Sequence, residues 1–113
     1  TINKINIPVE LETYKAITVE RCEHPDVSII IPVYNKFEFT HGCISSIIEN
    51  TRNIKYEIIV VDDNSTDNTL NLTKYIDGVQ YLRNKQNVGF IESCNSGAEH
   101  AKGKYVLFLN NDV

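Results

Sequence analysis

The chain has 113 residues, of which 42% are hydrophobic and 23% charged, a length and composition typical of one globular domain or part of one. Its 15 acidic and 11 basic residues give a net charge of −4, and Lys and Arg form no cluster, which excludes a nucleic-acid-binding surface. The longest apolar run, Val27–Val33, is too short to cross a bilayer, and no signal peptide is visible.

The first 26 residues have the weakest pattern. Pro8 could begin a helix, whereas residues 16–19 could equally be extended. We interpret residues 1–26 as an N-terminal extension that packs on the outside of the domain formed by residues 27–113.

A strand and a helix open this domain. The strand is predicted at Val27–Val33 and ends near Pro32, because proline cannot donate a hydrogen bond to a sheet. A helix follows from about residue 38 or 40 to residue 50, since apolar residues recur there at helical spacing. Its apolar face is predicted to carry Phe39, Cys43, Ile44, Ile47 and Ile48.

The second strand ends in a run of polar residues. Ile58–Val61 is apolar and rich in β-branched residues, as in a parallel strand that is covered on both faces. The next six residues, Asp62–Asp67, would lose hydrogen bonds to water if they continued a buried strand, so the chain must reach the surface there. The end of this run can cap a helix, which is predicted near residues 66–75 and carries Leu70 and Tyr75.

The last third of the chain repeats the pattern. Asp77-Gly78 signals a turn, and a third strand is predicted at Val79–Leu82, followed by a polar run. A helix is predicted at about residues 90–101, with Gly103 at its C′ position, and a last strand at Tyr105–Leu109. The apolar face of that helix is predicted to carry Phe90, Cys94, Ala98 and Ala101.

The alternation of strands and helices predicts an α/β fold, a Rossmann-like parallel sheet with helices on both faces and right-handed crossovers. The three cysteines form no C-x-x-C pair, and no histidine supplies a zinc-type spacing. We therefore expect reduced thiols, as in a cytoplasmic protein, with Cys43 and Cys94 filling the core.

Polar groups follow three of the four predicted strands: Tyr34 and Asn35 the first, Asp62–Asn64 the second, and Asn110–Asp112 the last. In a parallel sheet these ends lie along one edge. Singly, each group could be a packing, turn or capping residue, but together they favour a binding site. A carboxylate such as Asp112 suits a hard cation that also holds phosphate oxygens. An aromatic ring beside a carboxylate suits a flat base with N–H groups.

Four segments carry a family resemblance: VSIIIPVYN (27–35), EIIVVDDNSTD (57–67), NVGFIESCNSG (87–97) and GKYVLFLNNDV (103–113). In order and spacing they resemble the beginning of the family 2 inverting glycosyltransferases. The resemblance implies the N-terminal half of a GT-A fold, which binds a UDP- or dTDP-sugar together with Mg²⁺ or Mn²⁺. The sugar would pass to a hydroxyl of a glycan or a lipid-linked acceptor, as in the synthesis of cell-surface polysaccharides.

The resemblance also implies roles for individual residues. The ring of Tyr34 would stack on uracil or thymine, and the carboxylate of Asp63 would accept a hydrogen bond from the base N3–H, with Asp62 as supporting structure. Asp112 would bind the metal ion. The other residues implied for the nucleotide sugar are Pro32, Asn35, Asn87, Gly89, Asn95 and Asn111.

Two departures from the family pattern matter. The metal motif reads Asn110-Asn111-Asp112, so one acid is missing and the metal would take more ligands from diphosphate and water. The chain also stops at Val113, before the acceptor half and the catalytic base, which we expect beyond it.

We therefore expect a truncated enzyme that has no catalytic base and does not transfer sugar alone. We also expect a homodimer, formed through apolar surface near Val106 and Phe108. The full-length protein would lie in the cytoplasm, in part at the inner face of the membrane.

Three other classes of protein compete with this reading. A non-catalytic nucleotide-sugar-binding module would share every residue above and differ only in lacking an acceptor domain. A phosphoacceptor signalling domain would carry its acidic pair after the first strand and a lysine after the last, and neither fits here. A dinucleotide oxidoreductase is disfavoured because no G-x-G-x-x-G follows the first strand.

Overall fold

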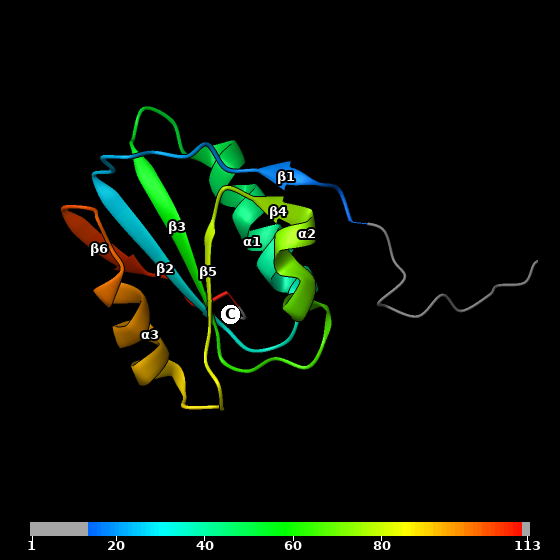
Figure 1. Ribbon diagram of the computed structural model, residues 1–113. Coiled ribbons are helices and arrows are strands. Elements are labelled where there is room, and N and C mark those ends of the chain that lie inside the picture. Colours follow the sequence, from blue (N-terminus) through cyan, green and yellow to red (C-terminus); the bar gives the residue numbers. More distant parts are fainter. Residues whose placement is uncertain (1–13, 112–113) are drawn as a thin grey trace, which may run out of the picture.

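The computed structural model describes residues 14–111, and a four-stranded parallel sheet lies at their centre (Figure 1). The strands lie in the order β5-β3-β2-β6, and β1 and β4 form a separate parallel pair. Later strands are thus added on both sides of β2, and such a change of direction creates a crevice at the carboxyl ends of the strands. The strands are β1 Ile17–Thr18, β2 Val27–Val33, β3 Tyr56–Asp62, β4 Ile76–Asp77, β5 Gln80–Arg83 and β6 Tyr105–Phe108.

Helices cover both faces of the sheet, with α1 and α2 on one side and α3 on the other (Figure 1). Side chains alternate along a strand, so Ile58 and Val60 pack in one cluster with Ile44 of α1, while Ile59 and Val61 belong to a second cluster on the face of α3. The predicted α/β fold, with a parallel sheet and helices on both faces, is confirmed. The helices are α1 Phe37–Asn50, the 3₁₀ helix η2 Asn68–Asn71, α2 Leu72–Tyr75 and α3 Phe90–Glu99.

The prediction of one α-helix near residues 66–75 is wrong. The structure has the short 3₁₀ helix η2 followed by a single α-helical turn, α2. Leu70, which the prediction placed on that helix with Tyr75, is exposed, and Leu72 is fully buried instead. A 3₁₀ helix has 3.0 residues per turn, so it rotates the side chains away from their α-helical positions.

Two aromatic residues predicted to lie on apolar helix faces are exposed. Helix α1 begins at Phe37, which is buried, and this leaves Phe39 on the outer side. Phe90 is the first residue of α3 and is also exposed. Helix α3 ends at Glu99, earlier than predicted, so Gly103 does not occupy its C′ position.

Helix α3 lies close to the sheet because of Gly97. A Cβ atom at this position would lie 2.5 Å from Cγ2 of Ile30 and 3.0 Å from Cγ2 of Val61. Cys94 is buried on the same helix and Cys43 is half-buried on α1, and burial raises the pKa of both thiols. Both cysteines therefore serve as core residues, as predicted.

The two ends of the described region differ in burial. In residues 14–26, which fall within the predicted extension, Val19 is buried in the core and β1 pairs with β4. At the other end, the four side chains of the edge strand β6 are exposed, including Val106 and Phe108 as predicted. The start of the helix that could begin at Pro8 lies outside the described residues, and Ile17–Thr18 is a strand, which favours the extended alternative for residues 16–19. Across residues 14–111, no helix is long and apolar enough to cross a membrane.

Candidate functional site

Asn35 joins the loop after β2 to the loop after β3. Its own backbone N–H donates to Oγ of Ser65 (2.7 Å), and its side-chain oxygen accepts hydrogen bonds from the N–H groups of Thr66 (2.8 Å) and Asp67 (3.2 Å). Asn35 and Lys36 both have positive φ angles, a conformation that asparagine tolerates better than most residues. The chain can therefore turn sharply between β2 and α1.

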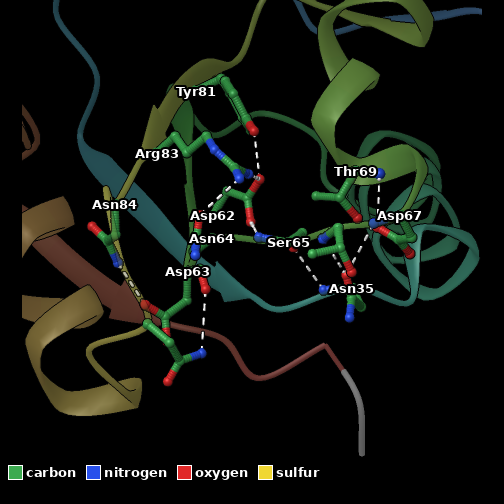
Figure 2. A network of polar contacts seen from close by, with 12 residues as sticks. Asn35, Asp62, Asp63, Asn64, Ser65, Asp67, Thr69, Tyr81, Arg83 and Asn84 are labelled. Atoms are coloured by element: carbon green, nitrogen blue, oxygen red, sulfur yellow. Dashed lines mark hydrogen bonds and ion pairs between the residues drawn. The ribbon is translucent and has the colours of Figure 1, made fainter.

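Asp67 caps two helices from this same loop. Its Oδ1 accepts from the N–H of Thr69 at the start of η2 (2.9 Å; Figure 2). Its Oδ2 accepts from the N–H of Phe37 at the start of α1 (3.1 Å). The residue before α1, Lys36, supplies no side-chain cap of its own. The two loops thus form one braced unit at the carboxyl ends of β2 and β3.

Asp62 and Asp63 point to opposite sides of the end of β3 (Figure 2). Asp62 is 0% exposed, and its carboxylate accepts hydrogen bonds from the Ser65 N–H (2.9 Å), the Tyr81 hydroxyl (2.5 Å) and the Arg83 guanidinium (2.8 Å). Burial, followed by the hydrogen bond to Asp62 and its charge, raises the pKa of Tyr81 to about 12. Asp62 is therefore fully engaged with the protein, in agreement with its predicted supporting role.

Asp63 lies on the side of α3 and binds the start of that helix. It is 6% exposed; its Oδ1 accepts from the Asn84 side-chain amide (2.9 Å) and the Val88 N–H (2.8 Å), and its Oδ2 accepts from the Gly89 N–H (2.9 Å). Burial by itself raises the pKa of Asp63, but these three hydrogen bonds outweigh it and hold the pKa below its ordinary value. The carboxylate is therefore ionised at neutral pH.

A hollow of about 380 Å³ opens at this edge of the sheet, between the ends of β2 and β3 and the start of α3. Tyr34, from the loop after β2, and Phe90, at the start of α3, are its two aromatic lining residues, and each is 52% exposed. The hollow has the size and mixed lining of a small-molecule site. Its lining residues are Pro32, Val33, Tyr34, Asn35, Lys36, Asp63, Gly89, Phe90, Ser93, Asn110 and Asn111.

Most residues predicted for the nucleotide sugar meet around this hollow, which Pro32, Tyr34, Asn35, Asp63, Gly89 and Asn111 all line. Two others do not line it. The side chain of Asn87 donates instead to the backbone oxygen of Asp63 (3.3 Å), and Asn95 is exposed on α3. The binding roles of all these residues stay predictions.

Two further residues of the site, Asn84 and Ser93, were not predicted from the sequence. The side-chain amide of Asn84 donates both to Asp63 and to Oγ of Ser93 (3.0 Å), so it connects the acid to the buried side of α3. A signal was present, because Asn84 stands in the polar run after β5, at a strand end like the other candidate residues. Ser93 had no signal, since a serine within a helix rarely indicates a contact of this kind.

The metal site predicted at Asp112 lies outside the described residues. Within residues 14–111, no three His, Cys, Asp or Glu side chains come together as metal ligands. The neighbouring Asn111 donates a hydrogen bond from its side-chain amide to Oγ1 of Thr40 (2.7 Å). Its side-chain carbonyl oxygen is a ligand of the kind that Mg²⁺ and Mn²⁺ bind. A hard cation here fits only if most of its ligands come from a bound ligand and water.

A larger hollow, of about 720 Å³, lies at the amino-terminal end of the strands, where Glu20, Arg21 and Lys55 are among its lining residues. It holds mixed charges from loops and none of the polar residues that follow the strands. In an open parallel sheet, ligands bind at the carboxyl ends of the strands. The smaller hollow beside Asp63 is therefore the better candidate.

Residues 28–113 match the model of the family described as "Glycosyl transferase family 2". The poly(ribitol-phosphate) beta-N-acetylglucosaminyltransferase TarP of Staphylococcus aureus is 40% identical over 91 residues, which cover 76% of this chain and 28% of TarP. A poly(ribitol-phosphate) beta-glucosyltransferase of Bacillus spizizenii is 38% identical over 97 residues, which cover 76% of this chain and 14% of that protein. The chain thus spans under a third of the length of these relatives.

Solved structures show the same fold. Residues 1–349 of S. aureus TarS in complex with UDP superpose with a TM-score of 0.67 at 27% identity, covering 77% of this chain and 27% of that fragment. The mannosyltransferase PcManGT of Pyrobaculum calidifontis, in complex with GDP-Man and Mn²⁺, gives a TM-score of 0.67 at 23% identity over 91% of this chain and 32% of that one. The chain has the GT-A fold of these proteins and belongs to glycosyl transferase family 2.

Proposed function

We propose that the hollow beside Asp63 binds the uracil or thymine nucleotide of a UDP- or dTDP-sugar, and that this chain is the donor-binding part of an inverting, metal-dependent glycosyltransferase. The observation that carries the proposal is the position of Asp63, a nearly buried carboxylate that lines a hollow with an exposed tyrosine ring. An ionised acceptor beside an aromatic face suits a flat base that presents an N–H group at its edge.

Asp63 has capacity for one more hydrogen bond. A carboxylate offers about four acceptor positions. Two on Oδ1 are filled by Asn84 and Val88, and one on Oδ2 is filled by Gly89, which leaves one on Oδ2. The N3–H of uracil or thymine fits that position, whereas cytosine has an unprotonated N3 that an ionised carboxylate repels.

The comparisons support a nucleotide-sugar donor. TarS, which is 27% identical over 77% of this chain, has been solved in complex with UDP and in complex with UDP-GlcNAc. TarP and the B. spizizenii relative carry the names of enzymes that add N-acetylglucosamine and glucose to poly(ribitol-phosphate). We infer an acceptor of the same broad kind, a hydroxyl of a cell-surface polysaccharide or of its lipid-linked precursor.

A divalent cation belongs to this proposal through Asp112. Mg²⁺ or Mn²⁺ held by Asp112 and by diphosphate oxygens would neutralise the charge that develops on the leaving diphosphate. The residues of this chain bind and orient the donor around that event: Tyr34 stacks on the base, Asp63 fixes its edge, and the loop braced by Asn35 holds Tyr34 in place.

The chain alone is expected to bind nucleotide without transferring sugar. Inverting transfer needs a base within hydrogen-bond reach of the acceptor hydroxyl. At the carboxyl ends of the described strands, Asp62, Asp63 and Asp67 are all engaged with protein donors. The alternative, a non-catalytic nucleotide-sugar-binding module, uses the same hollow, and a transfer assay on the longest natural form of the protein separates the two.

Isothermal titration calorimetry tests the binding. UDP or dTDP should bind, more tightly with Mn²⁺ or Mg²⁺, and CDP should bind more weakly because of its N3. Tyr34→Ala should weaken the binding of UDP, whereas Tyr105→Ala, at another exposed tyrosine that lies outside the hollow, should not. Asp112→Asn should abolish the metal enhancement. Equal affinities for UDP and CDP would contradict the role of Asp63, and absence of UDP binding would contradict the whole proposal.

A further inference from the structure

Phe90 is a large apolar residue that stays about half exposed at the start of α3. It is the first residue of α3, it is 52% exposed, and it lines the hollow beside Asp63. It contacts no other aromatic ring among residues 14–111, and the same holds for Tyr34. Both rings are therefore available to a ligand.

The two rings enter the hollow from different elements. Tyr34 comes from the loop after β2, and Phe90 from the start of α3, which packs on the opposite face of the sheet from α1. Asp63 lines the hollow together with both. A flat ligand held at its edge by Asp63 therefore has two aromatic residues available in the same hollow, one from each of two elements.

The position of Phe90 is fixed by the acid itself. Both oxygens of Asp63 accept from the turn immediately before Phe90, at the N–H groups of Val88 (2.8 Å) and Gly89 (2.9 Å). Gly89 has a φ angle of 95°, a conformation that glycine adopts without strain and that sets the direction in which α3 begins. The group that holds the edge of a base thus also holds the start of the helix that carries Phe90.

We propose that Phe90 is the second aromatic wall of the nucleobase site, so that the base lies between the rings of Tyr34 and Phe90 with its N3–H edge on Asp63. This inference rests on the proposed function, because it assigns a further residue to the same ligand. A base gains stacking contacts on both faces, and water is excluded from its hydrogen bond with Asp63.

Substitution at two adjacent positions tests the inference. Phe90→Ala should weaken the binding of UDP by roughly 5- to 150-fold, the usual effect of removing a stacking partner. Ile91→Ala is the matched control, since Ile91 is 74% exposed on the same helical turn and does not line the hollow, and its affinity for UDP should match that of the natural sequence. Phe90→Tyr should retain most of the affinity, and Phe90→Leu should lose most of it, because stacking needs a ring.

A second ligand shows which part of the nucleotide Phe90 contacts. If the ring touches the base, Phe90→Ala weakens UMP and UDP by the same factor. A loss that appears with UDP and not with UMP would place Phe90 on the diphosphate and overturn the inference. A thermal midpoint close to that of the natural sequence, measured without ligand, would show that the variant loses affinity and not its fold.

The outcomes separate this inference from the proposed function. If Tyr34→Ala and Asp63→Ala weaken the binding of UDP while Phe90→Ala does not, Phe90 does not stack on the base, and the proposed nucleotide site is still supported. If the natural chain binds neither UDP nor dTDP, both are wrong. If Phe90→Ala and Ile91→Ala weaken UDP equally, the effect belongs to the start of α3 as a whole, and the inference is also wrong.

Discussion

The carboxylate of Asp67 accepts a hydrogen bond from the backbone N–H of Phe37, 3.1 Å away, although 30 residues separate the two in sequence. The first turn of α1 is therefore capped by the loop that follows β3, and not by its own preceding residue. Since Tyr34 stands only three residues before Phe37, this contact couples the loop that carries Tyr34 to the acidic end of β3. The candidate site thus depends on a cap that joins two loops.

Asp67→Ala should lower the free energy of unfolding by about 2 kcal/mol, because it removes the caps of α1 and of η2 together. Chemical denaturation measures the change. Asp67→Asn, which keeps one side-chain oxygen and so one of the two caps, should cost about half as much. Equal stability of the Ala variant and the natural chain would show that the caps contribute nothing.

Asp62 and Asp63 should differ in what their removal affects. Asp62→Ala leaves the Tyr81 hydroxyl and the Ser65 N–H without their acceptor and should cost about 3 kcal/mol of stability, with little change in UDP affinity. Asp63→Ala should weaken UDP by about 1–3 kcal/mol in addition to loosening the start of α3. Calorimetric titration and thermal unfolding of both variants give the two rankings. If Asp62→Ala harms UDP binding more, the two acids have exchanged roles.

Protonation of Asp63 should destabilise the fold at acidic pH. Its pKa in the folded protein lies below the ordinary value of 3.8, so its contribution to stability is complete above about pH 4 and is lost as pH falls through the lower folded value. Asp63→Asn lacks this contribution at every pH. The thermal midpoints of the two proteins should differ most at neutral pH and converge as the pH falls below 3.8, and a constant difference would contradict the prediction.

The order of elements could be predicted from the sequence because its signals are local. Runs such as Ile58–Val61 predict buried parallel strands, and the polar residues after them mark the edge where the site forms. The polar run after the second strand also contained both acids of the site. The sequence alone therefore predicts that Tyr34 and Asp63 lie at the same edge of the sheet.

The errors arose where tertiary contacts override local pattern. A 3₁₀ turn begins after Asp67 because that carboxylate is already bound to α1, and this turn rotates Leu70 into solvent. Phe39 and Phe90 matched helical spacing, yet both are exposed, since α1 starts with Phe37 in the core and α3 starts at the hollow. Apolar character and helical spacing alone do not tell a buried residue from an exposed one.

Gly97 and Gly42 should respond in opposite ways to an added methyl group. A Cβ at Gly97 would clash with Ile30 and Val61, so Gly97→Ala should cost about 1–3 kcal/mol of stability. Gly42 lies within α1, and apart from its own helix no described residue has an atom within 4 Å of where its Cβ would be. Gly42→Ala should therefore stabilise the protein by about 0.5–1 kcal/mol through helix propensity. Denaturant titration measures both changes, and destabilisation by both would show that α1 packs more tightly than described.

The edge strand β6 should make residues 1–113 self-associate. Among residues 14–111 it pairs with β2 alone. All four of its side chains are exposed, with Val106 and Phe108 on one face and Tyr105 and Leu107 on the other. An apolar edge of this kind can pair with a second copy. Sedimentation velocity should show a dimer whose proportion rises with concentration.

Val106→Lys should shift the protein towards the monomer, because a charge on an edge strand opposes pairing. Leu70→Lys places the same charge at an exposed leucine on η2 and should leave the dimer intact. A monomer at every concentration, or equal dissociation by both lysines, would show that β6 is not the contact.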